Sequence, residues 1–156
     1  ARLLGARIPD QRGTAIAHGD YRFGNCLVDC ERGRISAVLD WELCTLGDPL
    51  ADVGYLGVYW ARDGVDQLRS NDPSGAPGFP TYEELVQRYA TRSGRAVDGI
   101  GYYVAFSSWR LAVISEGVYA RYLNGAMADQ VADLDQMKQG TERLAESALS
   151  ALRSLA

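Results

Sequence analysis

Three residues near the start of the chain have the side chains and the spacing that phosphoryl transfer to a hydroxyl requires. Asp20 and Asn25 lie five positions apart, and Asp40 follows fifteen positions after Asn25, at the end of an apolar run. A carboxylate such as Asp20 can accept the proton of a substrate hydroxyl. Amide and carboxylate oxygens are ligands that Mg²⁺ accepts beside phosphate oxygens. The pattern predicts ATP- and Mg²⁺-dependent phosphoryl transfer, with Asp20 as catalytic base and Asn25 and Asp40 as metal ligands.

Each of these residues also has an ordinary structural explanation. Asp20 could cap a turn, and Asn25 could be a turn residue after Gly24. Asp40 is harder to explain in this way, because a charge that ends an apolar strand is costly to bury without a partner or a metal. The combination of the three favours the catalytic interpretation.

Four polar neighbours are predicted to support the loop that carries Asp20. His18 is the only histidine, which excludes metallophosphatase and zinc-hydrolase sites because these need several. We expect His18 to fix the loop by hydrogen bonds, with proton shuttling as the alternative. Arg22 either contacts a phosphate or braces the loop. Asp48 and Asp52 are predicted to be a helix cap and a first-turn carboxylate that the helix dipole favours.

Length and composition indicate one domain over residues 1–156 and exclude several functions. The net charge is −4, without a basic stripe, so no nucleic-acid surface is expected. The apolar runs are shorter than the roughly 20 residues that a membrane span needs. Neither a membrane association nor a signal peptide is predicted, and a cytoplasmic location follows.

The three cysteines are an odd number, which argues against a disulfide framework. Cys26 and Cys30 could begin a metal site, but no fourth soft ligand is evident. We expect Cys26, Cys30 and Cys44 to be buried free thiols in a reducing compartment.

The elements that must position these residues form an α+β domain, mostly helical, with one small β-hairpin. Asp48-Pro49 is a helix start signal, and Thr81 with Glu84 forms a capping box. A loop rich in proline and glycine is predicted over residues 70–80. The other predicted elements are a helix end at 1–5, strands at 26–28 and 35–39, and helices at about 49–60, 82–93, 98–123 and from 128 to near the C-terminus.

Three motifs together resemble the aminoglycoside phosphotransferase / choline kinase family. They are residues 18–25 (His-Gly-Asp-Tyr-Arg-Phe-Gly-Asn), 38–42 (Val-Leu-Asp-Trp-Glu) and 47–52 (Gly-Asp-Pro-Leu-Ala-Asp). The match is specific over 16–57 and looser over the helical remainder. The resemblance implies the C-terminal lobe of a protein-kinase-like fold, with ATP as donor, Asp20 as base and Mg²⁺ on Asn25 and Asp40.

A second lobe is implied by what the 156 residues lack. No glycine-rich loop precedes the catalytic loop, the only lysine is Lys138, and 17 residues precede His18. Enzymes of this kind need a phosphate-covering loop and a lysine on the phosphates. We therefore expect the N-terminal nucleotide-binding lobe to be absent from this chain and the chain alone to be inactive. The exposed lobe interface is expected to be apolar, which could drive self-association.

The acceptor is less clearly encoded in the sequence. The segment 40–43 (Asp-Trp-Glu-Leu), with residues 116–122, is closest to a subgroup associated with acyl-CoA dehydrogenases. This likeness implies a hydroxylated small molecule such as a hydroxyacyl thioester. Choline-like alcohols and aminoglycosides stay open. Core packing is the alternative for the aromatic residues among the substrate-binding candidates, which are Glu42, Trp109, Arg110, Tyr119, Arg121 and Tyr122.

Two other classes of function compete with the enzyme. A pseudokinase-like module would bind a ligand or partner without turnover, and the presence of Asp20, Asn25 and Asp40 together argues against it. A structural helical interaction domain would have no Mg²⁺ affinity.

Overall fold

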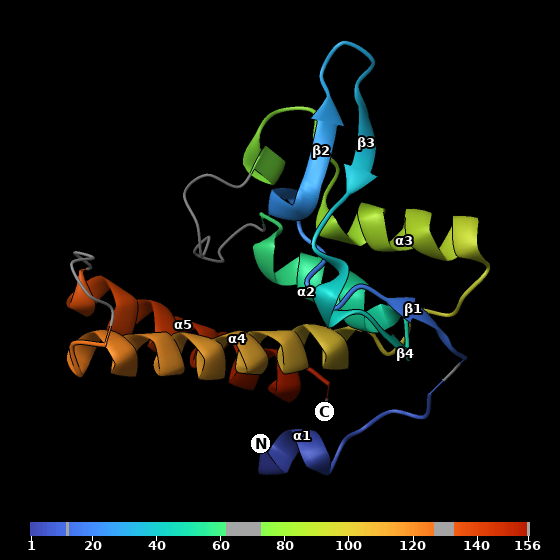
Figure 1. Cartoon of the computed structure of the whole chain (residues 1–156). Coiled ribbons are helices and arrows are strands. Elements are labelled where there is room, and N and C mark those ends of the chain that lie inside the picture. The colour runs from blue at the N-terminus through green and yellow to red at the C-terminus, as the bar shows by residue number, and fades with distance from the viewer. Residues whose placement is uncertain (12, 62–72, 127–132, 156) are drawn as a thin grey trace.

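The computed structural model describes residues 1–11, 13–61, 73–126 and 133–155. Helices dominate these residues, and the strands pair into two small antiparallel sheets (Figure 1). The α+β, mostly helical architecture predicted from the sequence is confirmed. The helices are α1 (Arg2–Gly5), α2 (Leu50–Tyr59), α3 (Tyr82–Ser93), α4 (Ile100–Leu123) and α5 (Leu134–Arg153). The strands are β1 (Ala15–Ala17), β2 (Cys26–Asp29), β3 (Arg34–Val38) and β4 (Thr45–Gly47), and the 3₁₀ turns are η1 (Phe23–Asn25), η2 (Trp41–Leu43) and η3 (Pro73–Gly75).

Helices α4 and α5 lie side by side as a long hairpin, and α2 packs against α4 (Figure 1). Gly54 permits the close contact between α2 and α4. A Cβ at this position would lie 2.6 Å from the Cβ of Tyr103 and 2.9 Å from the backbone nitrogen of Val104. Only glycine lets two helix backbones approach this closely without displacement. Helix α2 is therefore fixed on α4, and it carries the residues that hold the catalytic loop.

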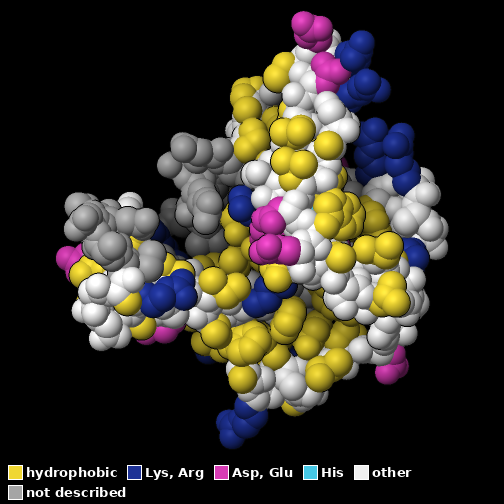
Figure 2. All heavy atoms as spheres, in the orientation of Figure 1, with side chains coloured by type: hydrophobic (Ala, Val, Ile, Leu, Met, Phe, Trp, Pro, Cys, Tyr) yellow, Lys and Arg dark blue, Asp and Glu magenta, His cyan; other side chains and the backbone are white. Residues whose placement is uncertain are grey.

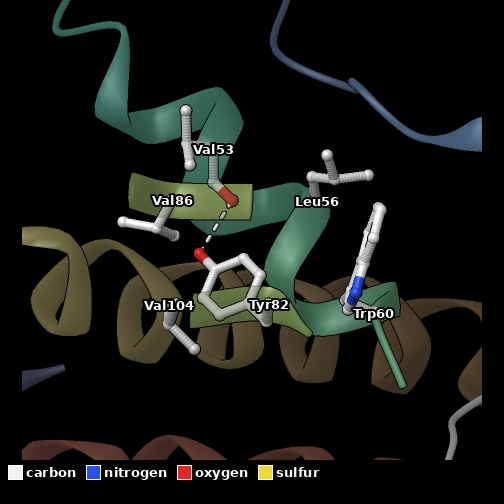
Figure 3. Close-up of a cluster of buried hydrophobic side chains, with 6 residues drawn as sticks. All are labelled: Val53, Leu56, Trp60, Tyr82, Val86 and Val104. Carbon is white, nitrogen blue, oxygen red and sulfur yellow. Dashed lines mark hydrogen bonds between the residues drawn. The ribbon is translucent and has the colours of Figure 1, made fainter. Parts of the chain in front are cut away.

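Two apolar clusters form the core. The first joins α2, α3 and α4, and the Tyr82 hydroxyl within it donates to the carbonyl oxygen of Val53 at 3.0 Å (Figure 3). The second joins α1, α4 and α5 through Leu4, Ala105 and Leu152. Full burial of each large apolar side chain stabilises the fold by about 1.5–3 kcal/mol. The residues of the first cluster are Val53, Leu56, Trp60, Tyr82, Val86 and Val104.

The loop at residues 18–25, called the catalytic loop because it carries Asp20, connects a strand of one sheet, β1, to a strand of the other, β2. Strands β2 and β3 form the predicted hairpin, with Cys26 opposite Val38. Strand β1 pairs with β4, with Ala15 opposite Gly47. This second pairing was not predicted, because it joins two strands of three residues that are distant in sequence. Together the sheets hold both ends of the loop at residues 18–25.

The helix boundaries follow the capping signals. Leu50 N donates to Asp48 Oδ1 at 2.9 Å, and the Thr81–Glu84 capping box is present. Asp133 caps α5 by accepting from Gln136 N at 2.9 Å. Residues 128–132 of the helix predicted there lie outside the described residues. Residues 70–72 of the predicted loop lie outside the described residues. No helix in the described part of the chain is long and apolar enough to cross a membrane.

The predicted burial of the cysteines was wrong. Cys30 and Cys44 are exposed, Cys26 is half-buried, and all three are free thiols. They lie in or beside two-stranded sheets, which have too few neighbours to cover both faces.

Candidate functional site

Asp52, in the first turn of α2, holds the backbone of the catalytic loop. Its Oδ2 accepts from His18 N at 2.6 Å, and its Oδ1 accepts from Gly19 N at 2.8 Å. Hydrogen bonds to an ionised acceptor are among the stronger ones in proteins. The carboxylate therefore ties two consecutive loop residues to a helix that is itself fixed in the core.

His18 is almost fully buried, and both of its ring nitrogens are engaged. Nε2 lies 2.7 Å from the carbonyl oxygen of Leu39, and Nδ1 accepts from Asp20 N at 3.2 Å. A carbonyl can only accept, so Nε2 carries the hydrogen and the ring is in its neutral form. The ring also lies 4.7 Å from that of Trp41, centre to centre. This arrangement favours loop support over proton shuttling.

The loop backbone is also held from the opposite side by α4. Gly19 has a φ of 86°, and a Cβ there would lie 2.7 Å from the carbonyl oxygen of Leu43. Arg110 Nη2 donates to the carbonyl oxygen of Gly19. The position of Gly19 thus requires glycine on both conformational and steric grounds. Arg110 thus contacts the loop, and its predicted contact with a substrate stays a prediction.

The Asp20 carboxylate receives several donors. Asn25 Nδ2 donates to both Asp20 O and Asp20 Oδ2, each at 2.8 Å. Arg22 Nε lies 3.4 Å from Oδ2, and the interaction with the Tyr55 hydroxyl also favours the ionised carboxylate. Burial alone would raise the pKa of Asp20, but these hydrogen bonds and the Arg22 charge together lower the pKa below its ordinary value. Asp20 is therefore a carboxylate at neutral pH, as a proton acceptor must be.

Tyr55 is a residue of the site that the sequence analysis missed. Burial and the hydrogen bond to Asp20 raise its pKa, so its hydroxyl stays protonated and acts as the donor. The guanidinium of Arg110 lies 4.4 Å from the centre of its ring. The signal was present in the sequence, because Asp52, Tyr55 and Tyr59 recur at three- and four-residue spacing and therefore share one face of α2.

Asn25 and Asp40 offer oxygen atoms that fit Mg²⁺. The Asn25 amide donates through Nδ2, and within the described residues no donor contacts its Oδ1. Leu39 N donates to Asn25 O at 2.8 Å, which brings Asp40 beside Asn25. No group of three or more His, Cys, Asp or Glu side chains among the described residues could hold a metal. Two protein oxygens are nevertheless enough for Mg²⁺, which keeps waters and phosphate oxygens as further ligands.

The conformation of Asp40 differs from the expectation of a buried charge. Its carboxylate is exposed and makes no hydrogen bond or ion pair with the described residues. Its backbone has φ 67° and ψ 52°, and no other non-glycine residue in the described ranges has a positive φ. A left-handed backbone at such a residue costs free energy and is found preferentially at functional sites. The unusual feature of Asp40 is therefore its left-handed backbone conformation and not the burial of its charge.

The remaining loop-supporting candidates have defined contacts. The Arg22 guanidinium lies 6.0 Å from the centre of the Tyr59 ring, in addition to its contact with Asp20, which favours bracing. Asp48 accepts from Leu50 N and from the Tyr103 hydroxyl. Burial first and this hydrogen bond second raise the pKa of Tyr103 to about 12.

The structure separates the predicted acceptor residues. Glu42 is exposed on η2, two residues after Asp40. Trp109 packs against the second core cluster, which favours the core-packing alternative for this residue. Tyr119, Arg121 and Tyr122 lie further along α4, roughly 14–18 Å beyond Arg110 at the rise of an α-helix.

Comparisons with known proteins agree with this geometry. The family model for the phosphotransferase enzyme family (APH) matches residues 1–85. Acyl-CoA dehydrogenase family member 10 from Mus musculus is 38% identical over 149 residues, which are 93% of this chain and 14% of that protein. Acyl-CoA dehydrogenase family member 11 from Homo sapiens is 35% identical over 114 residues, which are 70% of this chain and 14% of that protein.

A solved structure extends the likeness to the fold. The crystal structure of a candidate aminoglycoside phosphotransferase from Ralstonia eutropha matches with a TM-score of 0.76 and 34% identity, over 96% of this chain and 46% of that one. The kinase-like fold predicted from the sequence is confirmed. The chain thus spans less than half the length of this structure and about one seventh of the two curated relatives.

Proposed function

The chain belongs to the phosphotransferase enzyme family, and we propose that it is the acceptor-activating part of an ATP- and Mg²⁺-dependent small-molecule O-phosphotransferase. The observation that carries the proposal is the linked pair of Asp20 and Asn25. One amide contacts the ionised Asp20 carboxylate through Nδ2, and the Asn25 backbone carbonyl accepts from the N–H of Leu39, the residue before Asp40.

In this proposal Asp20 orients the acceptor hydroxyl and takes its proton as the oxygen attacks phosphorus. Tyr55 keeps the carboxylate in place without accepting that proton itself, since its pKa is raised. Asn25 and Asp40 would hold Mg²⁺, which neutralises charge on the transferred phosphoryl group when it is bound. Because Asn25 contacts Asp20, a single side chain sets the position of the base relative to a metal ligand.

The residues that bind adenine, and the lysine that binds the phosphates, would come from a lobe outside these 156 residues. The apolar surface over the sheets supports this part of the proposal. Ile16 is 66% exposed, Leu46 74%, Leu43 59% and Val28 57%. Figure 2 shows apolar side chains along the β2–β3 hairpin and below it. A surface of this kind normally lies against a partner, and self-association of the isolated chain is the competing use of it.

We favour a hydroxyacyl thioester as acceptor, because the relatives are named as acyl-CoA dehydrogenase family members. Choline-like alcohols and aminoglycosides are the alternatives to be tested beside it.

The test is Mg²⁺-dependent ADP release from a version of the protein extended upstream by roughly 100 residues, a typical domain length. Acceptors would include hydroxyacyl thioesters, choline-like alcohols and aminoglycosides. Asp20→Asn should abolish acceptor-stimulated release, and the matched control Asp135→Asn, at an exposed position on α5, should not. Tight Mg-ATP binding without release for any acceptor would instead support a pseudokinase-like binding module.

A further inference from the structure

A pocket of about 510 Å³ lies between β1, η2, α2 and α3, beside the catalytic loop. This volume is in the range of about 300–1,000 Å³ that small-molecule sites occupy. The lining is predominantly apolar and aromatic, as in most such sites. Its apolar residues come from these four elements and from the end of β3, and include Ile16, Val38, Trp41, Val53, Leu56 and Leu85.

The pocket is separate from the groups proposed for phosphoryl transfer. Asp20, Asn25 and Asp40 do not line it, whereas His18 and Tyr21 of the same loop do. The polar atoms that His18 and Asp52 bring to the wall are engaged in hydrogen bonds with the loop and with Leu39. On this side of the pocket, a ligand would therefore make mainly apolar contacts.

Two arginines give the pocket a charge. Arg88 and Arg92 line it from α3, four residues apart, so they lie on one face of the helix. Both are exposed, and neither forms an ion pair with the described residues. The acidic residue in the lining is Asp52, whose two oxygens already accept backbone N–H groups. Within the described ranges, no acidic side chain is paired with either of the two positive charges.

We propose that this pocket binds an amphipathic anion, with an aliphatic body in the apolar cavity and a carboxylate or phosphate head on Arg88 and Arg92. Arginine recognises both heads through paired N–H donors. An aliphatic body fits because the cavity walls contain few free polar groups. A ligand here would contact the loop through His18 and Tyr21 but leave Asp20 accessible to an acceptor.

The proposal is tested by calorimetric titration of the 156-residue chain with decanoate and with decyl phosphate, both below their aggregation concentrations. Decanol and decyltrimethylammonium are the neutral and cationic probes of equal chain length. We expect both anions to bind, and decanol and the cation to bind at least about tenfold more weakly. The ratio between decanoate and decyl phosphate identifies the preferred head.

Two variants separate charge recognition from simple apolar adsorption. Arg88→Ala/Arg92→Ala should weaken anion binding about tenfold or more and leave decanol binding unchanged. The matched control Arg2→Ala/Arg153→Ala removes two exposed arginines elsewhere and should change neither. Circular dichroism checks that each variant is folded. No binding of either anion, or equal binding of anion, alcohol and cation, would overturn the proposal, as would an unchanged anion affinity in Arg88→Ala/Arg92→Ala. These outcomes are independent of any ADP release.

Discussion

The side chain of Asn25 donates to both the backbone carbonyl and the carboxylate of Asp20, each at 2.8 Å. Asn25 is almost fully buried, and its own backbone carbonyl accepts from Leu39 N. One residue therefore joins the catalytic loop to the end of the hairpin. This link relates the proposed base to the proposed metal ligands without any group from another lobe.

Asn25→Ala should damage both stability and activity. Removal of the amide takes one donor from two half-buried acceptors of Asp20, its carbonyl oxygen and its Oδ2, which costs about 1–3 kcal/mol of unfolding free energy. In the extended protein, kcat should fall on the order of 100-fold, because the orientation of the base and a metal ligand are lost together. Urea unfolding and the ADP assay measure the two effects. Unchanged stability would show that the Asn25–Asp20 hydrogen bonds do not contribute.

Tyr55→Phe should raise the pKa of Asp20 by removing a donor to its carboxylate. The folded-state pKa of Asp20 lies below the ordinary 3.8. The stability that ionised Asp20 gives to the folded protein is therefore fully present above that pH. It is lost as the pH falls through the lower pKa that Asp20 has in the folded state. The variant should lose about 1 kcal/mol at pH 7, after allowance for solvent screening, and less in strong acid. Carbon NMR titration of Asp20 measures the pKa, and a value equal to that of the unsubstituted protein would contradict the assignment of Tyr55 as donor.

Asp40→Gly should separate stability from function. Glycine accepts the left-handed backbone that an aspartate adopts at a cost of about 1 kcal/mol, so the unfolding free energy should stay level or increase by up to that amount. The proposed metal ligand is lost, and Mg²⁺-dependent ADP release should disappear from the extended protein. Asp40→Asn, which tolerates the same backbone and keeps an oxygen, should retain part of the activity. Full activity in Asp40→Gly would remove Asp40 from the metal site.

Gly54→Ala should destabilise the contact between α2 and α4. The new methyl group would lie within 3 Å of Tyr103 and Val104 atoms, including backbone, and overpacking of this kind costs about 1–3 kcal/mol. Gly117→Ala is the matched control on α4, since a Cβ there meets nothing within 4 Å. It should stabilise the helix by up to about 1 kcal/mol. Denaturant unfolding of both variants tests the prediction, and equal effects would refute it.

Features that depend on near neighbours in the chain could be predicted from the sequence. The Asp48 and Thr81 caps, the αL glycine after α3 and the β2–β3 hairpin all arise from residues within a few positions of each other. The spacing of Asp20, Asn25 and Asp40 belongs to the same group. The resemblance of the three motifs to a known family implied the kinase-like fold, and the spacing identified residues whose catalytic roles are still predictions.

Only the tertiary structure decided which distant groups hold the catalytic loop. Asp52 and Arg110 reach it from helices that are 33 and 91 residues away from Gly19, and no local pattern encodes such contacts. The exposure of Asp40 and of the cysteines, and the position of Arg88 and Arg92 at the pocket, likewise depend on how the elements pack. The physical reason is the range of the interactions: caps and turns are set by the adjacent backbone, whereas burial and long-range hydrogen bonds exist only once helices and sheets have met.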